Sequence, residues 1–508
     1  MNPTHDWERE LSETPVGFGG FSTQTMRKVK ERIAVMERRT NRRPLAAALA
    51  VLTSLAILGV VFRDQWTGWL APGTETGPAW PEEEEEIVTL RVDFFDGPSF
   101  HIQYGDAFVI RHPSVRFETI PADRRLATPE AYAQWARENQ IDLLCIPLAF
   151  VDDLSRDGLL LPLDPLIARD GFDLGKLYGP VVNAIREAGA GTLYGLAPTF
   201  NAYALYYNKS LFEEHGVPLP ADGMHWDDVL NTAARFAGLS AADGQPVYGL
   251  SFGEGWRPGT AVRALDAGLH QGLQIAGYDA SGKLVPSLDT PSWRAWWEKV
   301  AEGLGTGAIY DAKPPETQGN AFMSELYPRD AFLTGRSAMA YGDHYFIHHI
   351  REAARQNLFT DEWGVVALSA SAAGSGATHG LSVSYVFAIN AASPFADKAW
   401  EWLKFTHGED QRHRELRSEV QTLHVNMAAA DREDGPDAIF YQLQADPAAV
   451  LRQDEWRSKA DYQALYAFLT SHLDTRLQDV AAGRRTAENM LEELQQLAET
   501  VRLHEVGR

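Results

Sequence analysis

An uninterrupted apolar segment near the start of the chain is the feature that most restricts its architecture. Residues 45–62, LAAALAVLTSLAILGVVF, hold no charged side chain, and ten of these 18 residues are Leu, Ile, Val or Phe. A helix of this length just spans the hydrocarbon core of a bilayer. The ten side chains favour insertion by roughly 3 to 6 kcal/mol in total. The sequence therefore predicts a transmembrane helix over residues 44–62.

The charges on the two sides of this segment predict its orientation. Residues 26–43 contain eight Lys or Arg and two Glu, whereas Arg63 is the only basic residue between the apolar segment and residue 86. Because basic flanks stay on the cytoplasmic side, we expect residues 1–43 in the cytoplasm and the rest of a single-pass membrane protein outside the cell. A cleaved signal peptide is the alternative, although the 43 residues that precede the predicted helix are a long N-terminal region for a signal peptide.

Composition limits the rest of the chain. Residues 63–86 contain Pro, Gly and Thr and end in five consecutive Glu, which is typical of a spacer, so the folded part is expected to begin at residue 87. The formal net charge of −23 argues against a nucleic-acid partner, because phosphate backbones require a basic surface. Cys145 is the single cysteine and lies in an apolar run, which indicates a buried side chain and excludes an intramolecular disulfide.

Beyond the spacer, short apolar runs alternate with helical patterns. Residues 87–95, 115–121 and 141–150 are predicted strands, and residues 128–139, TPEAYAQWAREN, are a predicted helix with Thr128 as its N-cap. This alternation predicts an α/β lobe with a largely parallel sheet. A further strand is expected over 203–208, and the C-terminal half is largely helical, including a helix that begins after Thr486.

One organised segment carries no recognisable chemistry. Residues 204–220, ALYYNKSLFEEHGVPLP, are followed by HWDDVL at 225–230. Together they resemble a signature of extracellular solute-binding proteins of the sugar-binding, maltose-binding-protein-like family 1 type, which serve ABC importers. Three further segments resemble the same family in the same chain order, and the resemblance extends over about residues 87–503. They are residues 141–167, 330–347 and 383–405.

The resemblance implies an α/β, two-lobed periplasmic-binding-protein-like fold of the hinged type II with multiple crossovers, here preceded by one transmembrane helix. It implies that lobe one holds residues 87–200 and 380–424 and that lobe two holds residues 201–379 and 425–508. The chain would cross between them near Asn201, near Gly380–Ser382 and near His424–Val425. Such a protein closes two lobes around a ligand and needs no catalytic residue, cofactor or metal.

The resemblance also suggests which residues contact the ligand, mainly in loops that follow strands. The candidates are Phe95, Asp96, Phe150, Asp152, Phe200, Asn201, Trp256, Arg257, Asp343, His344, Tyr345, Tyr462 and Tyr466. For each of them, an ordinary aromatic or polar surface residue is the alternative interpretation. Ile146 stands about where maltose-binding protein has a sugar-stacking Trp, which argues against a maltose-type ligand.

Three histidines in HYFIHH have a spacing that could bind a transition metal on one helix face. Only Asp343 lies nearby to complete a ligand set, so we expect no metal site. Instead, His344 is expected to face the cleft, with His348 and His349 on the polar side of a helix.

The leading interpretation is a membrane-anchored extracellular protein, not an enzyme, that captures a small solute for an ABC permease. Its expected ligand is a mono- or oligosaccharide. The first alternative is a ligand-sensing receptor ectodomain whose residues 1–43 signal in the cytoplasm. The second is a secreted glycoside hydrolase, which would need two carboxyl groups flanking a cleft, and no such pair is recognisable in the sequence.

Overall fold

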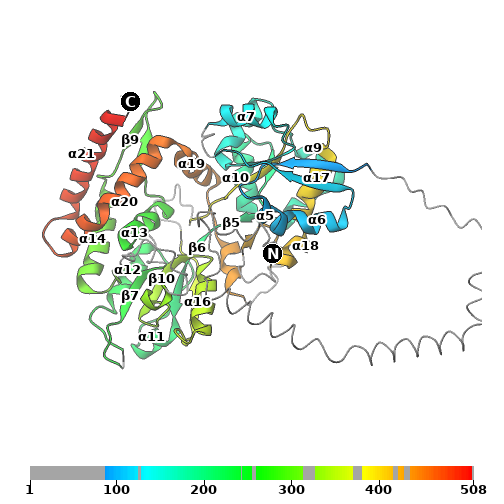
Figure 1. Ribbon diagram of the computed structural model, residues 1–508. Helices are drawn as coiled ribbons and strands as arrows, with labels where there is room; N and C mark the ends of the chain where they lie inside the picture. Colours follow the sequence, from blue (N-terminus) through cyan, green and yellow to red (C-terminus); the bar gives the residue numbers. More distant parts are fainter. Residues whose placement is uncertain are drawn as a thin grey trace, which may run out of the picture. The chain divides into compact units, whose positions relative to one another are not determined.

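The computed structural model describes residues 86–505 except 124–127, 242, 254–258, 313–325, 370–379, 416–421 and 428–434 (Figure 1). The predicted transmembrane segment, the basic segment before it and the acidic spacer lie outside the described residues, as do Trp256 and Arg257. Within the described part, no helix combines the length and the apolar character needed to cross a bilayer. Residues Glu86–Arg508 form one compact unit.

The first part of this unit is built on a five-stranded mixed sheet. Its strands, in spatial order, are β2 (Val115–Thr119), β1 (Val88–Val92), β3 (Leu143–Ile146), β12 (Val386–Ile389) and β4 (Gly195–Leu196). β1 runs parallel to β2 and β3, whereas β12 is antiparallel to β3 and β4. The sequence predictions of β1, β2 and β3 are confirmed. β12, which follows much later in the chain, completes the sheet between β3 and β4.

Short helices surround this sheet. They are α5 (Gly97–Phe100), η1 (His101–Gly105), α6 (Asp106–Arg111), α7 (Pro129–Glu138), η2 (Leu148–Phe150), α8 (Val151–Arg156), α9 (Asp164–Asp170), η3 (Leu174–Lys176), α10 (Gly179–Ala188), α17 (Ala396–Thr406) and α18 (Glu409–Glu415). The expected N-cap of α7 is confirmed, because the Thr128 hydroxyl accepts a hydrogen bond from the Ala131 N–H at 3.3 Å. Trp402 on α17 is fully buried against the rings of Phe100, Tyr104 and Phe387.

The second part is built on a four-stranded sheet. Its order is β11 (Trp363–Val366), β6 (Tyr203–Asn208), β10 (Ser337–Asp343) and β7 (Tyr248–Phe252). β6 is antiparallel to both of its neighbours, whereas β10 and β7 are parallel. Its helices are α11 (Lys209–Glu214), α12 (Trp226–Ala234), α13 (Thr260–His270), α14 (Pro291–Thr306), η4 (Tyr327–Arg329) and α16 (Phe346–Arg355), with a hairpin of β8 (Ala276–Tyr278) and β9 (Leu284–Pro286).

Residues 207–209, YNK, have a structural role in this second part. β6 ends at Asn208, whose side-chain oxygen accepts a hydrogen bond from the Leu211 N–H at 3.2 Å and so caps α11. The Asn208 amide also donates to Asp361 at 2.7 Å. Asn208 is fully buried, and these two contacts satisfy polar groups that would otherwise be costly to bury. The segment therefore joins a central strand to its helix and holds that helix against β11.

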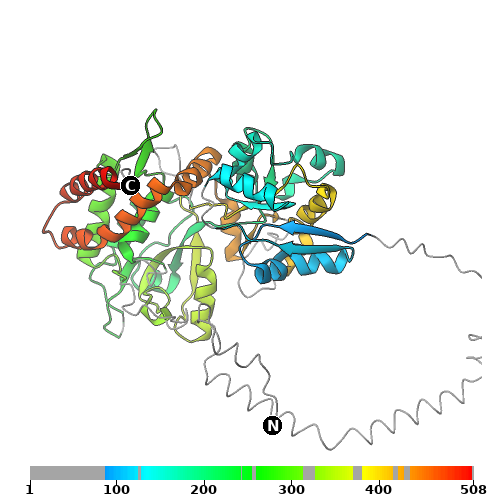
Figure 2. The ribbon, with the colours of Figure 1, turned by 45° about the horizontal axis from the view of Figure 1, so that its top comes forward.

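The C-terminal helices contact both parts. They are α19 (Pro447–Ser458), α20 (Ala460–Ala481) and α21 (Ala487–Glu505), preceded by η6 (Pro436–Gln442). α19 packs against α10 and η2 beside the first sheet, whereas α20 packs against α13 and α14 beside the second. α20 and α21 lie side by side (Figure 2). Lys459 has an extended backbone and separates α19 from α20. These two consecutive helices therefore pack on different parts of the molecule.

Three of the described segments that link the two sheets lie next to one another. β5 (Thr199–Phe200) pairs antiparallel with β13 (Leu423–His424). Asn201 and Ser382 exchange two backbone hydrogen bonds, of 2.9 and 3.0 Å between nitrogen and oxygen. This arrangement gives the chain a two-lobed α/β fold whose connections form a narrow hydrogen-bonded band.

Candidate functional site

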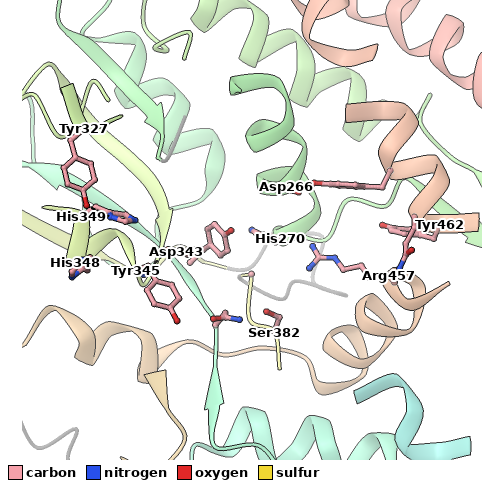
Figure 3. Close-up of a pocket in the computed structure, with 15 residues that line it drawn as sticks. Asp266, His270, Tyr327, Asp343, Tyr345, His348, His349, Ser382, Arg457 and Tyr462 are labelled. Carbon is pink, nitrogen blue, oxygen red and sulfur yellow. Dashed lines mark hydrogen bonds between the residues drawn. The ribbon is translucent and has the colours of Figure 1, made fainter. Parts of the chain in front are cut away.

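A cavity of about 810 Å³ opens beside the connecting segments (Figure 3). Its volume lies within the range of small-molecule sites in proteins. Polar and aromatic side chains from the connecting segments, from the second sheet and from the C-terminal helices line this large cavity. The lining residues are Asn201, Tyr203, Asp266, His270, Tyr327, Asp343, Tyr345, His348, His349, Gly380, Ser382, Arg457, Tyr462, Gln463 and Tyr466.

One wall of the large cavity is built where β10 ends. Asp343 is the last residue of β10, and its carboxylate accepts a hydrogen bond from the Tyr345 N–H at 2.9 Å. This contact turns the chain into α16, which carries His348 and His349 into the lining. His349 is buried, and its Nδ1 lies 3.1 Å from the hydroxyl of Tyr327. Ligands of open α/β sheets commonly bind at such strand ends.

The opposite wall contains the largely buried carboxylate of Asp266. The Tyr466 hydroxyl donates a hydrogen bond to Asp266 Oδ1 at 2.6 Å, and Arg263 Nη1 lies 4.0 Å from Asp266 Oδ2. Burial raises the pKa of the Asp266 carboxyl, while the hydrogen bond from Tyr466 and the charge of Arg263 oppose that rise. Burial and the nearby Asp266 charge raise the pKa of Tyr466 as well, so Tyr466 keeps its proton and remains a donor.

The floor of the large cavity depends on a close approach of backbone to aromatic rings. Tyr203 and His270 lie with ring centroids 4.5 Å apart, and His270 Nδ1 is 3.1 Å from the hydroxyl of Tyr341. Gly380 adopts a φ of +66°, and a Cβ at this position would lie 2.4 Å from Tyr203 Cδ2 and 3.0 Å from the His270 ring. Only glycine fits both this conformation and this space.

We therefore expect Gly380→Ala to impair both stability and ligand binding. The left-handed backbone alone costs alanine about 1 kcal/mol, and displacement of Tyr203 adds to this cost and weakens ligand affinity by about tenfold. Gly216→Ala is the matched control, because Gly216 has a φ of +64° and nothing within 4 Å of the added Cβ. Denaturant unfolding and titration calorimetry of both variants would test this. Equal losses in the two variants would contradict it.

A second, adjoining cavity of about 570 Å³ shares Asn201 and Tyr345 with the large cavity. Its other walls come from the first sheet and its helices. They are Phe95, Ile102, Gln103, Tyr104, Thr199, Phe200, Ser384, Tyr385, Gln411, Arg414 and Thr422. Phe95 is 61% exposed, and the hydroxyls of Tyr104 and Tyr385 are 2.6 Å apart. The two cavities therefore meet at a junction formed by Asn201 from a connecting segment and Tyr345 from the second lobe.

The structure brings together several of the residues predicted from sequence. Five of them line the large cavity: Asn201, Asp343, Tyr345, Tyr462 and Tyr466. Phe95 and Phe200 line the adjoining cavity, which also contains Asn201 and Tyr345. Trp256 and Arg257 lie outside the described residues.

Four other candidates are placed elsewhere. Phe150 belongs to η2, a 3-10 turn that directs its ring into the core against Tyr132, and Asp152 forms an ion pair with Arg156 on α8. Asp96 caps α5 by accepting a hydrogen bond from the Ser99 N–H at 2.9 Å. His344 is buried with its ring beside Tyr345, at 4.2 Å between centroids.

The histidines of HYFIHH therefore lie elsewhere than expected. His348 and His349 line the large cavity, while His344 packs behind Tyr345. Within the described part of the chain, no group of three or more His, Cys, Asp or Glu side chains is arranged to hold a metal ion.

Eight further lining residues were not predicted from the sequence: Tyr203, Asp266, His270, Tyr327, Gly380, Ser382, Arg457 and Gln463. Tyr203 begins β6, Asp266 and His270 lie on α13, Ser382 lies on a connecting segment, and Arg457 lies near the end of α19. The i, i+4 spacing of Asp266 and His270 places both on one helix face, and this spacing is the sequence feature from which a shared polar face could have been predicted. Nothing local distinguishes Arg457, because its place in the lining depends on how α19 packs.

The arrangement suits reversible binding of a polar molecule. Tyrosine faces can pack against apolar faces of a ligand, while carboxylates, imidazoles, amides and a guanidinium can exchange hydrogen bonds with its hydroxyl groups. Two lobes joined by paired connections, with a polar and aromatic cavity beside those connections, have the architecture of a solute-binding protein.

The chain belongs to the bacterial extracellular solute-binding protein family. The family model matches residues 135–412, which is more than half of the chain. This result confirms the resemblance found in the sequence.

Individual relatives are distant in sequence, and two solved structures share the fold. A binding protein of Brucella abortus (strain 2308) is 24% identical over 327 residues, which cover 64% of this chain and 72% of that protein. The fold is similar to a sugar transporter structure from Rhizobium etli in an open conformation, with a TM-score of 0.53, 19% identity and coverage of 81% of this chain and 99% of that one. It is also similar to the sugar-binding protein MalE from Xanthomonas citri, with a TM-score of 0.54, 14% identity and coverage of 82% and 97%.

Proposed function

We propose that this protein captures a saccharide between its two lobes and delivers it to the permease of an ABC importer. The observation that carries the proposal is the large cavity itself, which lies beside the three paired connections and joins aromatic faces to hydrogen-bonding groups. Sugars present both apolar C–H faces and dense hydroxyl groups, so this mixture of side chains suits them. Two proteins of similar fold are named as a sugar transporter and a sugar-binding protein, which supports the same ligand class.

The proposed lobe boundaries follow the chain's crossings. Lobe one comprises residues 87–200 and 380–424, and lobe two comprises residues 201–379 and 425–508. α19 is the exception that we add to this division, because it contacts α10 and η2 of lobe one although it follows the third crossing.

A membrane anchor formed by residues 44–62, with the N-terminus in the cytoplasm, is part of the proposal. Its support is the 18-residue apolar segment and the eight basic residues before it. Such a tether would keep the binding lobes near the permease and raise their effective concentration there. Membrane fractionation of the full chain and of a chain that lacks residues 1–62 tests it, since only the full chain should sediment with membranes.

A saccharide panel tests the binding function. At a ligand concentration one hundred times the Kd, binding stabilises the native protein by about 2.7 kcal/mol, which raises the melting temperature measurably. We expect at least one mono- or oligosaccharide in the panel to produce this shift and to be recovered unchanged after incubation. Absence of a shift with every saccharide would contradict the ligand class, and cleavage of the bound saccharide would favour a hydrolase.

A further inference from the structure

Arg457 places a guanidinium in the large cavity, and no side chain of the described residues is hydrogen-bonded to it. It lies near the end of α19, is half-buried, and extends its guanidinium toward the middle of the cavity (Figure 3). The described residues offer no hydrogen-bond acceptor to this guanidinium, and the Arg457 carbonyl oxygen is the atom that receives a bond from Gln463. A cation that is partly removed from water is costly unless an acceptor meets it.

The carboxylates that influence Arg457 are engaged elsewhere. Asp266 accepts its hydrogen bond from Tyr466 and lies beside Arg263, and Asp454 accepts the Ala149 N–H at 2.8 Å. Burial raises the pKa of both carboxyl groups, which weakens their compensation of the Arg457 charge. Asp343 lies on the wall that carries Tyr345, and its carboxylate already accepts a hydrogen bond from the Tyr345 N–H.

We propose that the saccharide bound in the large cavity carries a carboxylate, as a uronic acid unit does, and that Arg457 receives this group. The inference rests on the proposed function and narrows its ligand class. A guanidinium presents two parallel N–H groups in one plane, which match the two oxygens of a carboxylate. The single positive charge of one guanidinium balances the single negative charge of a carboxylate, whereas it would balance only half of the charge of a doubly charged phosphate.

The position of α19 makes this contact a link between the lobes. Asp454, one turn before Arg457, fixes α19 to the backbone of η2 beside lobe one. Tyr462 and Tyr466 lie beyond the helix break at Lys459, on α20, which packs against lobe two. A ligand whose ring packs on these tyrosines while its carboxylate binds Arg457 therefore contacts groups held by different lobes.

The experiment compares matched sugars on the full-length protein in detergent. Titration calorimetry and thermal shift are measured with galacturonate and galactose, glucuronate and glucose, and mannuronate and mannose, each as monosaccharide and as short oligomer. Galactose 6-phosphate and glucose 6-phosphate form a separate arm. We expect at least one uronate to bind about tenfold or more tightly than its neutral counterpart, because one charge-assisted pair is added.

Variants then assign the preference to Arg457. Arg457→Gln should reduce the ratio of uronate to neutral affinity to near one, and Arg457→Lys should retain part of it, because the charge remains while the planar fork is lost. Arg452→Gln on the same helix is the matched control, since Arg452 is exposed and lies outside the cavity lining. This control removes one positive charge and should leave the ratio unchanged.

The outcomes separate this inference from the proposed function. Tighter binding of neutral sugars than of their uronates by the unaltered protein would overturn the inference and leave the function standing. Tighter binding of the sugar phosphates would overturn the assignment of a carboxylate, and an equal loss in Arg452→Gln would overturn the role of Arg457. Binding of no saccharide at all would overturn the function itself.

Discussion

Acidification from pH 7 toward pH 4 should destabilise this protein strongly, and two buried histidines should account for most of the slope. Burial lowers the pKa of His407 to about 3 and that of His424 to about 3, from an ordinary value of 6.5. Both side chains are fully buried. His424 accepts a hydrogen bond from the Asn426 N–H at Nδ1 and donates from Nε2 to the Thr406 carbonyl, so its neutral form already satisfies both nitrogens.

The sign of the effect follows from proton uptake. Above pH 6.5 both histidines are neutral in the folded and unfolded states, and the stability is complete. Between pH 6.5 and about 3 the unfolded chain binds protons that the folded chain excludes, so stability falls as the pH falls. Each histidine contributes up to roughly 4 to 5 kcal/mol over this window. Burial also raises the pKa of Asp93 to about 6, which offsets part of the loss by up to roughly 3 kcal/mol.

Denaturant unfolding at a series of pH values measures this slope directly. His424→Gln should be less stable than the parent protein at pH 7, because a well-packed ring is lost, but its stability should depend less on pH. His413→Gln is the control, because His413 is an exposed histidine on α18 and should leave the slope unchanged. A free energy of unfolding that stays level between pH 6.5 and 4 would contradict the assignment.

Replacement of Tyr345 by alanine should produce the largest loss of ligand affinity among single substitutions in the site. Tyr345 lines both cavities and faces the junction with Asn201. Its ring packs on the buried His344, and its backbone is fixed by Asp343, so little conformational freedom must be lost when a ligand binds. Loss of an aromatic face at this place should cost about 2 to 3 kcal/mol, or about 30- to 150-fold in Kd.

Tyr345→Phe distinguishes ring contact from hydroxyl contact and should retain most of the affinity if packing dominates. Tyr248→Ala is a suitable control, because Tyr248 lies on β7 and its ring packs on Tyr310 away from both cavities. Calorimetry with the saccharide that stabilises the parent protein provides the measurement. A loss below threefold in Tyr345→Ala would show that the ligand does not cross the junction of the two cavities.

The sequence predicted the elements that local pattern determines. β6, the Thr128 cap of α7 and strands β1, β2 and β3 of the first sheet follow from apolar runs and from a residue that can cap a helix. The family resemblance predicts ligand contacts at Asn201 and Tyr345, and the structure places both in the cavity lining. Phe150 follows a predicted strand, but the chain turns there into a 3-10 helix that directs its ring into the core.

The missed residues share a physical reason. Asp266, His270 and Arg457 lie on helices, where sequence spacing shows which residues share a face but not which face meets the cavity. That choice is made by packing between elements distant in the chain, such as α13 against α20 and α19 against α10. Packing of this kind depends on the whole fold, so no local motif marks these side chains.

The paired connections give the motion of this protein a particular character. Because β5 bonds to β13 and Asn201 bonds to Ser382, a torsional change in one of these three segments would be passed to its hydrogen-bonded neighbours, so that a hinge movement here would involve all three. Asn201 and Ser382 belong both to these segments and to the cavity lining. A movement of the connecting segments would therefore move Asn201 and Ser382 together, so residues of the hinge region also belong to the proposed binding surface.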